Sequence, residues 1–442
     1  MDEGFTYLES FTNFEVQPGL TRAWRLERME ELCLATGNPE TRFASIHIAG
    51  SKGKGSTATY LAALLEASGE PTGLYTSPHI EDYRERITRS GTYLPEDLYL
   101  EGLRWVEESV RRIEKQRLTG GELPTTFELL TLLAFKLFGS FPLAVLETGM
   151  GGRLDATNVV RPLATAITPI ELEHTEYLGD TIEAIAGEKA GIVKEGVPVF
   201  TAPLHPEAQK VVNRKAKQMN AECLAYADIV EEESISVSRR GTEVEAAVFG
   251  ERFTFRLSLL GRRQARNALL ALAVARRLRP EISPQLIASA LPAVSLPGRM
   301  ELLSGDPSLV IDGAHTPESV ASLCETLKEL YPSKWTLIFG SVAGKRHREM
   351  AEILIPLIRE VIVLRPGTFR QSNLEELASP FRNARLPCRI EEDAEGALTL
   401  AVDAAPPESC IVAVGSFYLA GAVRRAAREL GGWHPIPEGG TG

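Results

Sequence analysis

With 442 residues and 44% hydrophobic content, the chain can fill roughly two or three separate hydrophobic cores. A formal net charge of −11 argues against a partner that is a nucleic acid or an anionic membrane, so neither is expected. The five cysteines lack CxxC spacing, and no stretch looks like a targeting peptide or a membrane span. We therefore expect a cytoplasmic protein with reduced thiols that acts on small molecules.

In the first half of the chain, buried strands alternate with helices. An amphipathic helix is expected within residues 20–36 and a buried strand at 44–49, followed by a glycine-rich turn and a helix over 57–68. An apolar helix over 127–138 and strands at 143–146 and 164–168 come next. This alternation predicts a large α/β domain with a doubly wound parallel sheet.

A second α/β series begins after a Pro297-Gly298 break, so we place the domains at 1–296 and 297–442. The second domain should be Rossmann-like, and the tail from His434 should be loose. Between the two series, residues 226–260 alternate charged and β-branched residues around two glycines, which is typical of antiparallel hairpins. The expected elements of the second domain are strands 309–311, 335–339, 361–364 and 410–414, a helix over 317–330, and a last helix after 414.

The strongest chemical signal is Gly50-Ser51-Lys52-Gly53-Lys54-Gly55-Ser56, which follows a strand and opens a helix. Free backbone N–H groups and the helix dipole favour an anion there, and Lys54 can reach the β- and γ-phosphates of a nucleotide. The loop is P-loop-like without being a strict Walker loop, because Ile48 occupies the position of its first glycine. The alternative is a glycine turn with a surface lysine.

Glu147 ends a predicted strand and precedes the glycines at 149, 151 and 152. Its carboxylate should emerge at the carboxyl edge of the sheet, where it suits Mg²⁺ together with hydroxyl and phosphate oxygens. The alternative is a surface glutamate. His174 follows the next strand and can reach the same edge, although a lone histidine is more often structural. Lys189 lies on an apolar helix, where most lysines are solvated or lay their stems on apolar surface.

Asp312-Gly313-Ala314-His315 follows a strand of the second domain at its carboxyl end, which suits contact with ribose or phosphate. The alternative is an N-terminal helix cap, which fits Thr316 but does not account for His315. The turn Gly415-Ser416 after the last strand could receive a second anion.

Together these segments resemble the folylpolyglutamate synthase and dihydrofolate synthase family of the Mur ligase superfamily, over about residues 20 to 430. The residues that carry the resemblance are GSKGKGS at 50–56, TSPHI at 76–80 with ERI at 85–87, Phe127-Glu128, ETGMGGRLDATN at 147–158, LGDT at 178–181, EKAGI at 188–192, PGR at 297–299, DGAH at 312–315 and GSFYL at 415–419.

The resemblance implies an ATP-dependent ligase that adds L-glutamate to folate or dihydropteroate through an acyl phosphate. We expect the protein to be a monomer. It implies that Lys189 is carbamylated and that Mg²⁺ is bound. The implied catalytic residues are Lys54, Lys189 and His315. The implied ligands are Gly50, Gly53, Lys54, Gly55, Ser56, Asn267, Arg299 and Asp312 for ATP, Ser77, Glu147 and His174 for Mg²⁺, and Phe127, Glu128 and Asp155 for the pterin end of the substrate.

Several positions depart from the family pattern and leave the acid and the amine open. They are Glu173 in place of Asp, Arg263 in place of His, Leu296 in place of Trp, Thr316 in place of Asn and Gly344 in place of Asp. The alternatives are a Mur-type ligase with another acid or amine, a P-loop kinase or NTPase, and a regulatory nucleotide-binding protein.

Overall fold

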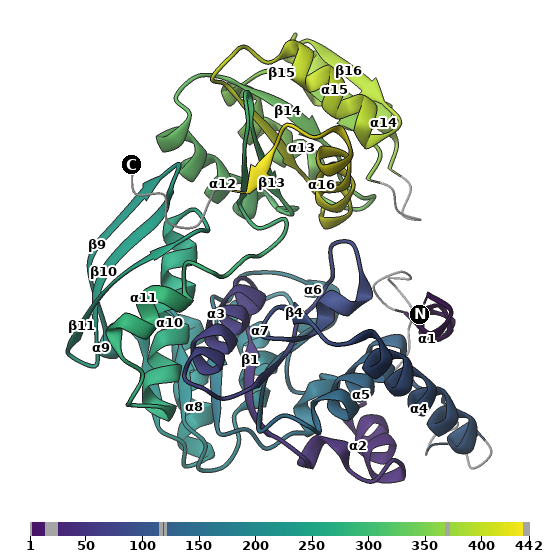
Figure 1. Ribbon diagram of the computed structural model, residues 1–442, viewed down its shortest axis with the longest axis vertical. Helices are drawn as coiled ribbons and strands as arrows, with labels where there is room; N and C mark the ends of the chain where they lie inside the picture. The colour runs from purple at the N-terminus through teal and green to yellow at the C-terminus, as the bar shows by residue number, and fades with distance from the viewer. Residues whose placement is uncertain (1, 14–24, 115–117, 119–121, 367–371, 436–442) are drawn as a thin grey trace. The chain divides into compact units, whose positions relative to one another are not determined.

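A mostly parallel sheet with strand order β4-β3-β2-β5-β1-β6-β7-β8 forms the centre of the first part of the chain. The computed structural model describes residues 2–13, 25–114, 118, 122–366 and 372–435 (Figure 1). The strands are β1 (Ala44–Ala49), β2 (Thr72–Tyr75), β3 (Ile87–Arg89), β4 (Thr92–Tyr93), β5 (Leu143–Glu147), β6 (Ala164–Ile167), β7 (Val199–Thr201) and β8 (Cys223–Ala225). The edge strands β3 and β4 are antiparallel, which the sequence did not predict.

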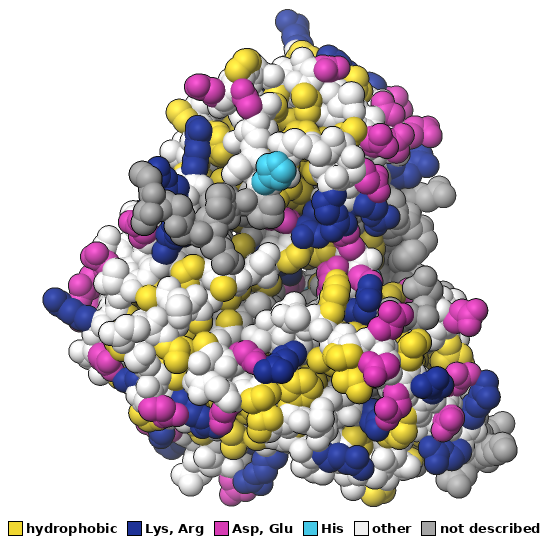
Figure 2. All heavy atoms as spheres, viewed as in Figure 1, with side chains coloured by type: hydrophobic (Ala, Val, Ile, Leu, Met, Phe, Trp, Pro, Cys, Tyr) yellow, Lys and Arg dark blue, Asp and Glu magenta, His cyan; other side chains and the backbone are white. Residues whose placement is uncertain are grey.

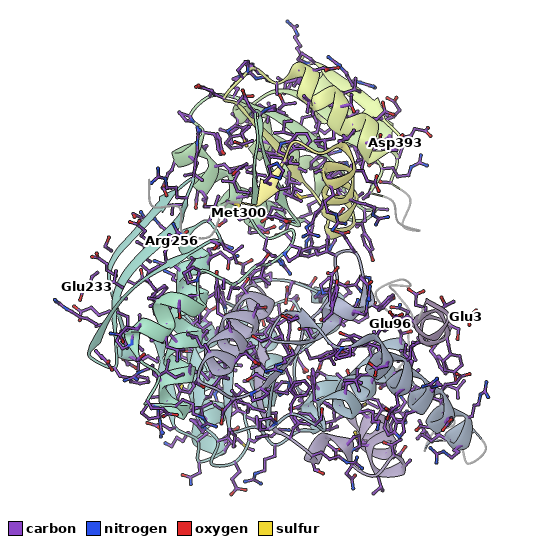
Figure 3. The ribbon with its side chains drawn as sticks, in the orientation of Figure 1. Glu3, Glu96, Glu233, Arg256, Met300 and Asp393 are labelled. Atoms are coloured by element: carbon purple, nitrogen blue, oxygen red, sulfur yellow. The ribbon has the colours of Figure 1, made fainter. Side chains whose placement is uncertain are left out.

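Helices cover both faces of this sheet. One apolar core joins the sheet to α1 (Asp2–Glu9), α2 (Leu26–Ala35), α4 (Glu96–Glu114) and α5 (Thr126–Phe138). Figure 3 labels Glu3 on α1 and Glu96 at the first residue of α4. Further helices are α3 (Lys54–Ala67), α6 (Thr175–Leu178), α7 (Ile182–Lys189), α8 (Pro206–Gln218), α9 (Tyr226–Ile229), α10 (Arg262–Leu278) and α11 (Pro284–Ala290).

The hairpins expected between the two series are present as β9 (Val230–Ser238), β10 (Gly241–Val248) and β11 (Glu251–Leu257), in the order β11-β10-β9. Two-residue connections between neighbouring strands require them to run antiparallel. The glycines anticipated as turn residues, Gly241 and Gly250, have positive φ angles of 130° and 78°.

A second sheet with the order β16-β15-β14-β17-β13-β12-β18 forms the later part of the chain. Its strands are β12 (Glu301–Ser304), β13 (Ser308–Asp312), β14 (Trp335–Phe339), β15 (Ile358–Leu364), β16 (Cys388–Glu391), β17 (Cys410–Val414) and β18 (His434–Pro435). One core packs the sheet on α12 (Pro317–Leu330), α13 (His347–Leu354) and α14 (Leu374–Asn383), and another packs it on α15 (Ala394–Ala404) and α16 (Phe417–Leu430).

The predicted α/β class with two parallel-sheet domains is confirmed, and two local expectations are wrong. The first helix after the glycine turn begins at Lys54 rather than at residue 57, because Gly53 supplies a left-handed N-cap with φ 83°. The tail expected to be loose from His434 starts instead with β18, which pairs with Leu303 and Ser304 of β12. Residues 436–442 lie outside the described part of the chain.

The chain divides into two compact units, which we describe separately. Unit 1 comprises Met1–Glu233, Glu245–Phe255 and Arg266–Leu291, and unit 2 comprises Ser234–Val244, Arg256–Ala265 and Pro292–Gly442. The simpler boundary between residues 296 and 297 stays a prediction. No helix in the described segments is both long and apolar enough for a membrane span. On the face drawn in Figure 2, the described positive and negative side chains are interspersed.

Candidate active site

The glycine-rich loop at residues 50–56 joins β1 to α3 at the carboxyl edge of the unit 1 sheet. The backbone N–H groups of Ser51 and Lys52 donate to the carbonyl of Pro169, at 2.8 and 3.2 Å. The Ser51 hydroxyl donates to the carbonyl of Glu171 at 3.0 Å. The segment after β6 therefore braces the loop, while the first N–H groups of α3 have no helical partner and favour an anion.

Two glycines of this loop lie where a side chain would collide with a neighbour. A Cβ atom at Gly50 would stand 1.8 Å from Thr168 Oγ1, and one at Gly53 would stand 2.5 Å from Asn267 Oδ1. Asn267, on α10, is 8% exposed, and its distance from Gly53 places its side chain directly against the loop. This position is compatible with the nucleotide contact expected of Asn267.

Two lysine ammonium groups converge on the carbonyl oxygen of Gly50. Lys54 Nζ donates to it at 3.0 Å, and Lys189 Nζ donates at 2.8 Å. Lys189 is 1% exposed, so the view of it as a solvated helix lysine is wrong. Both cations stand at the loop where we expect a polyphosphate, and such a ligand needs positive charge.

Glu173 is the counter-ion of the buried lysine, with Lys189 Nζ donating to Glu173 Oε1 at 2.8 Å. Burial lowers the pKa of Lys189 to about 8, against the raising effect of Glu173. Burial raises the pKa of the Glu173 carboxyl, but the neighbouring lysines outweigh it and bring this pKa to about 2. The Lys189 ammonium is thus held between the Gly50 carbonyl and the Glu173 carboxylate.

Glu147, the last residue of β5, contacts both the start of α3 and Ser77, which follows β2. Its side chain is 3% exposed, and its Oε2 atom accepts the backbone N–H of Ser77 at 2.9 Å. A Cβ at Gly55 would stand 3.2 Å from the same oxygen, so the carboxylate lies against the start of α3. Glu147 and Ser77 are therefore together at the edge of the sheet, next to the expected phosphates.

His174 follows β6 at the same edge and is the left-handed N-cap of α6, with φ 47°. Among the described residues, no three His, Cys, Asp or Glu side chains come close enough to hold a metal ion. The predicted ligands are the Glu147 carboxylate, the Ser77 hydroxyl and the His174 imidazole. The two oxygen donors fit Mg²⁺, which prefers oxygen ligands and keeps waters or phosphate oxygens in its remaining positions, whereas the imidazole is a less usual ligand for it.

Asp155 and the glycines before it form a loop with a buried carboxylate at its centre. Asp155 Oδ2 accepts the N–H groups of Gly149 and Met150 at 2.9 and 3.0 Å, and Oδ1 accepts the N–H and the hydroxyl of Thr157. Burial raises the pKa of Asp155, and these hydrogen bonds oppose that rise. The carboxylate thus holds the loop together, and its side chain is 2% exposed.

Glu128 has an internal role as well. It closes a capping box with Thr125 at the start of α5, and its carboxylate accepts two hydrogen bonds from Arg28 Nε, at 2.9 and 2.8 Å. Of the three residues expected near the pterin, Phe127 alone is only half-buried. Its ring covers Gly149, where a Cβ would stand 2.5 Å from the ring carbon Cζ.

In unit 2, two predicted residues, Arg299 and His315, lie against the ring of Phe417, which was not itself a predicted site residue. The Arg299 guanidinium lies 4.1 Å from the centroid of Phe417, and the His315 ring lies 5.6 Å from it. Asp312 accepts the N–H groups of Met300 and Ala314, each at 2.7 Å. The signal that could have identified Phe417 is its place inside the quoted segment 415–419.

In unit 2, the residue expected to cap a helix, Thr316, and a residue of the expected anion-binding turn, Ser416, are both N-caps. Thr316 caps α12 in a capping box with Ser319, as predicted. Ser416 caps α16, because its hydroxyl accepts the N–H of Leu419 at 3.0 Å. A hydroxyl that accepts this bond can still donate its own proton, so the anion site expected at Gly415-Ser416 stays a prediction.

Two family models match the chain. The Mur ligase middle domain matches residues 48–275, and the Mur ligase glutamate ligase domain matches residues 298–417. The first covers the phosphate loop, Glu147, Lys189 and Asn267. The second covers Arg299, Asp312 and His315.

Whole-length relatives agree with these domain matches. Folylpolyglutamate synthase of Lacticaseibacillus casei is 34% identical over 97% of this chain and 99% of its own length. A probable bifunctional folylpolyglutamate synthase/dihydropteroate synthase of Haloferax volcanii is 35% identical over 96% of this chain, which spans only 50% of that protein. A solved complex of FPGS with AMPPCP and folate superposes with a TM-score of 0.83 at 31% identity, covering 97% of this chain and 99% of the other.

Proposed function

Because the chain belongs to the folylpolyglutamate synthase and dihydrofolate synthase family of Mur ligases, we propose that it joins L-glutamate to a carboxylate of folate or dihydropteroate with ATP. The observation that carries this proposal is the convergence of Lys54 and Lys189 on the loop at 50–56, beside the carboxylate of Glu147. Such a site can hold a polyphosphate and a divalent cation together.

In the first step, a carboxylate oxygen of the pterin acid attacks the γ-phosphorus of ATP. The bond to the β,γ-bridging oxygen breaks, which gives an acyl phosphate and ADP. Negative charge on the transferring group is stabilised by Lys54 and by the free N–H groups at the start of α3. Lys189 keeps the loop in place through the Gly50 carbonyl and adds a second positive charge.

In the second step, the amine of glutamate attacks the acyl carbon. A tetrahedral intermediate forms, inorganic phosphate leaves with the electron pair of its C–O bond, and the nitrogen loses a proton to give the amide. Holding the amine and the acyl phosphate in one orientation makes this step effectively unimolecular. Arg299 and His315, which lie against Phe417, and Asp312, which accepts the N–H of Ala314, are the unit 2 residues that we assign to the nucleotide.

We assign Mg²⁺ to Ser77, Glu147 and His174, where it would neutralise charge on the phosphates. Removal of divalent cations with EDTA should therefore stop phosphate release, and added Mg²⁺ should restore it. Glu147→Gln should raise the Mg²⁺ concentration needed for half-maximal activity. A monomeric state and residence in the cytoplasm stay predictions. Carbamylation of Lys189 stays one as well, and it would replace the positive charge assigned to Lys189 in the first step with a negative one.

The deciding assay measures phosphate release with each substrate omitted in turn. A ligase requires both the pterin acid and glutamate, an NTPase requires neither, and a regulatory protein releases no phosphate. Dihydropteroate and tetrahydrofolate should be compared as acceptors, and aspartate should be tried in place of glutamate. Lys54→Ala should abolish turnover, whereas Lys210→Ala, which alters an exposed lysine of α8, should not. Retained turnover in Lys54→Ala would contradict the phosphate-loop assignment.

A further inference from the structure

A chain of buried polar groups begins in the middle of β1, at His47. This side chain is fully buried, and its Nε2 atom lies 2.7 Å from the hydroxyl of Thr157. Thr157 belongs to the short 3₁₀ turn Ala156–Val159 and is fully buried as well. Its hydroxyl donates to Asp155 Oδ1. One histidine in a central strand is thus connected to the carboxylate at the centre of the glycine loop.

The donor and the acceptor can be assigned in each of the hydrogen bonds that connect His47, Thr157 and Asp155. The proton of the Thr157 hydroxyl goes to Asp155, so the oxygen of that hydroxyl must accept its other hydrogen bond from His47. His47 therefore carries its proton on Nε2. Burial, followed by the charge of Lys194, lowers the pKa of His47 to about 3, so the ring is neutral.

The other ring nitrogen of His47 shows that this residue is more than core filling. Nδ1 is buried and accepts no hydrogen bond from any residue that the structure describes. Burying an unpaired acceptor is unfavourable, and an apolar side chain of similar size would avoid it. The hydrogen bond from Nε2 to Thr157 is the contact that an apolar residue could not replace.

The last residue of this hydrogen-bonded series, Asp155, holds the loop that lies under Phe127, a residue expected near the pterin. Asp155 Oδ2 holds the N–H groups of Gly149 and Met150, and Gly149 lies directly under the ring of Phe127. Because the ring leaves no room for even a methyl group at Gly149, a displacement of this loop must displace Phe127.

We propose that His47 and Thr157 are positioning residues for the acid substrate, and that they act through Asp155 on the Gly149 and Met150 amides to set the place of Phe127. The inference rests on the proposed function, because it takes Phe127 as part of the acceptor site. Both His47 and Thr157 are fully buried, so we expect neither to touch the substrate. Their effect should therefore fall on binding of the pterin acid and not on binding of ATP.

Paired variants separate this role from general stability. Thr157→Val keeps the shape of the side chain and removes its donor, and His47→Leu removes the Nε2 donor. Each should raise KM for the pterin acid by about tenfold, the worth of roughly one buried hydrogen bond, and leave KM for ATP within about twofold. Because both changes interrupt one chain, the double variant should be no worse than either single variant.

Conservative replacements should restore binding. Thr157→Ser keeps the hydroxyl, and His47→Gln keeps an N–H donor at about the reach of Nε2. Both should stay within about threefold of the native KM for the acid. If His47→Gln behaves like His47→Leu, or if the KM values for the acid and for ATP rise together, the proposal is overturned.

Residue-resolved hydrogen exchange tests the hydrogen bonds from His47 to the Gly149 and Met150 amides without an activity assay. In Thr157→Val, the amides of Gly149 and Met150 should exchange faster. The amide of Thr148, which donates to the Ile48 carbonyl at 2.9 Å, should keep its native rate and serves as the internal control. Unchanged exchange at Gly149 and Met150 would overturn the proposal. Lack of ligation by the native chain would instead refute the proposed function, and the exchange experiment would still decide the role of His47.

Discussion

A substitution at the buried ion pair of Arg28 and Glu128 can decide whether Glu128 stabilises the fold or binds the pterin. Both residues are 5% exposed, and Glu128 also accepts the N–H of Thr125 at 2.7 Å. Glu128→Gln would leave the guanidinium buried without its main counter-charge. Breaking a buried pair from one side typically costs about 3–5 kcal/mol. The second partner of Arg28, Glu122, remains at 2.9 Å with a side chain 33% exposed, so we expect about 3 kcal/mol.

Urea unfolding at pH 7 measures this loss, and a double variant isolates the pair. Arg28→Met should destabilise by a similar amount, while Arg28→Met combined with Glu128→Gln should lose about 1–2 kcal/mol less than the sum of the single losses. The control is Glu107→Gln on α4. It breaks an ion pair with Arg111, in which the two side chains are 36% and 69% exposed, and it should cost no more than about 0.5 kcal/mol.

The family resemblance makes the opposite prediction for the same variant. If Glu128 binds the pterin directly, Glu128→Gln should raise KM for the acid and leave the unfolding free energy within about 1 kcal/mol of the native value. That outcome would refute the structural role that we assign to Glu128. A large loss of stability, with KM for the acid unchanged in the folded protein, would support it.

Three further predictions concern other parts of unit 1. Gly53→Ala should weaken AMPPCP binding by more than about tenfold in calorimetry, since its Cβ meets the Asn267 side chain at 2.5 Å and φ is 83°; Gly69→Ala, with φ 94° and open space, should not. The pKa of Glu173, about 2 against an ordinary 4.5, implies stability that is complete above pH 4.5 and lost as pH falls toward 2. Glu173→Gln should abolish that part of the acid dependence of unfolding. Tyr83→Phe removes the hydroxyl that donates to Glu9 of α1, and faster amide exchange over residues 78–86 should follow.

Regular elements with a clear apolar pattern were predictable from the sequence. The ranges expected for β1, β14, β17 and α12 are those observed. In these elements, buried runs or a helical period agree with the local residue preferences, and tertiary contacts do not override them. The start of α3 was misjudged because Lys54, Gly55 and Ser56 look like loop residues, while the left-handed turn that allows a helix there is at Gly53.

The partners of the buried charges could not be predicted in the same way. Arg28 meets Glu128 across 100 positions of the sequence, and Lys189 meets Glu173 on a different element. A sequence motif indicates which residue type stands at which edge of the sheet. It does not indicate which side chains or N–H groups will donate hydrogen bonds to a carboxylate there. For this reason Glu128 and Asp155 could be assigned to the substrate from resemblance, although the structure surrounds both with internal donors.

The end of β1 connects two loops of the proposed site, the phosphate loop at residues 50–56 and the glycine loop at residues 149–152 that lies under Phe127. The carbonyl of Ile48 accepts the N–H of Thr148, and the carbonyl of Ala49 accepts the N–H of Thr168. One hydrogen bond fixes the start of the glycine loop under Phe127, and the other fixes the segment that braces the phosphate loop. Because ladder hydrogen bonds hold neighbouring strands in register, these loops cannot shift independently at their origins. In the reaction that we propose, the sheet would hold the two loops in place, and loop residues such as Lys54 would supply the charge.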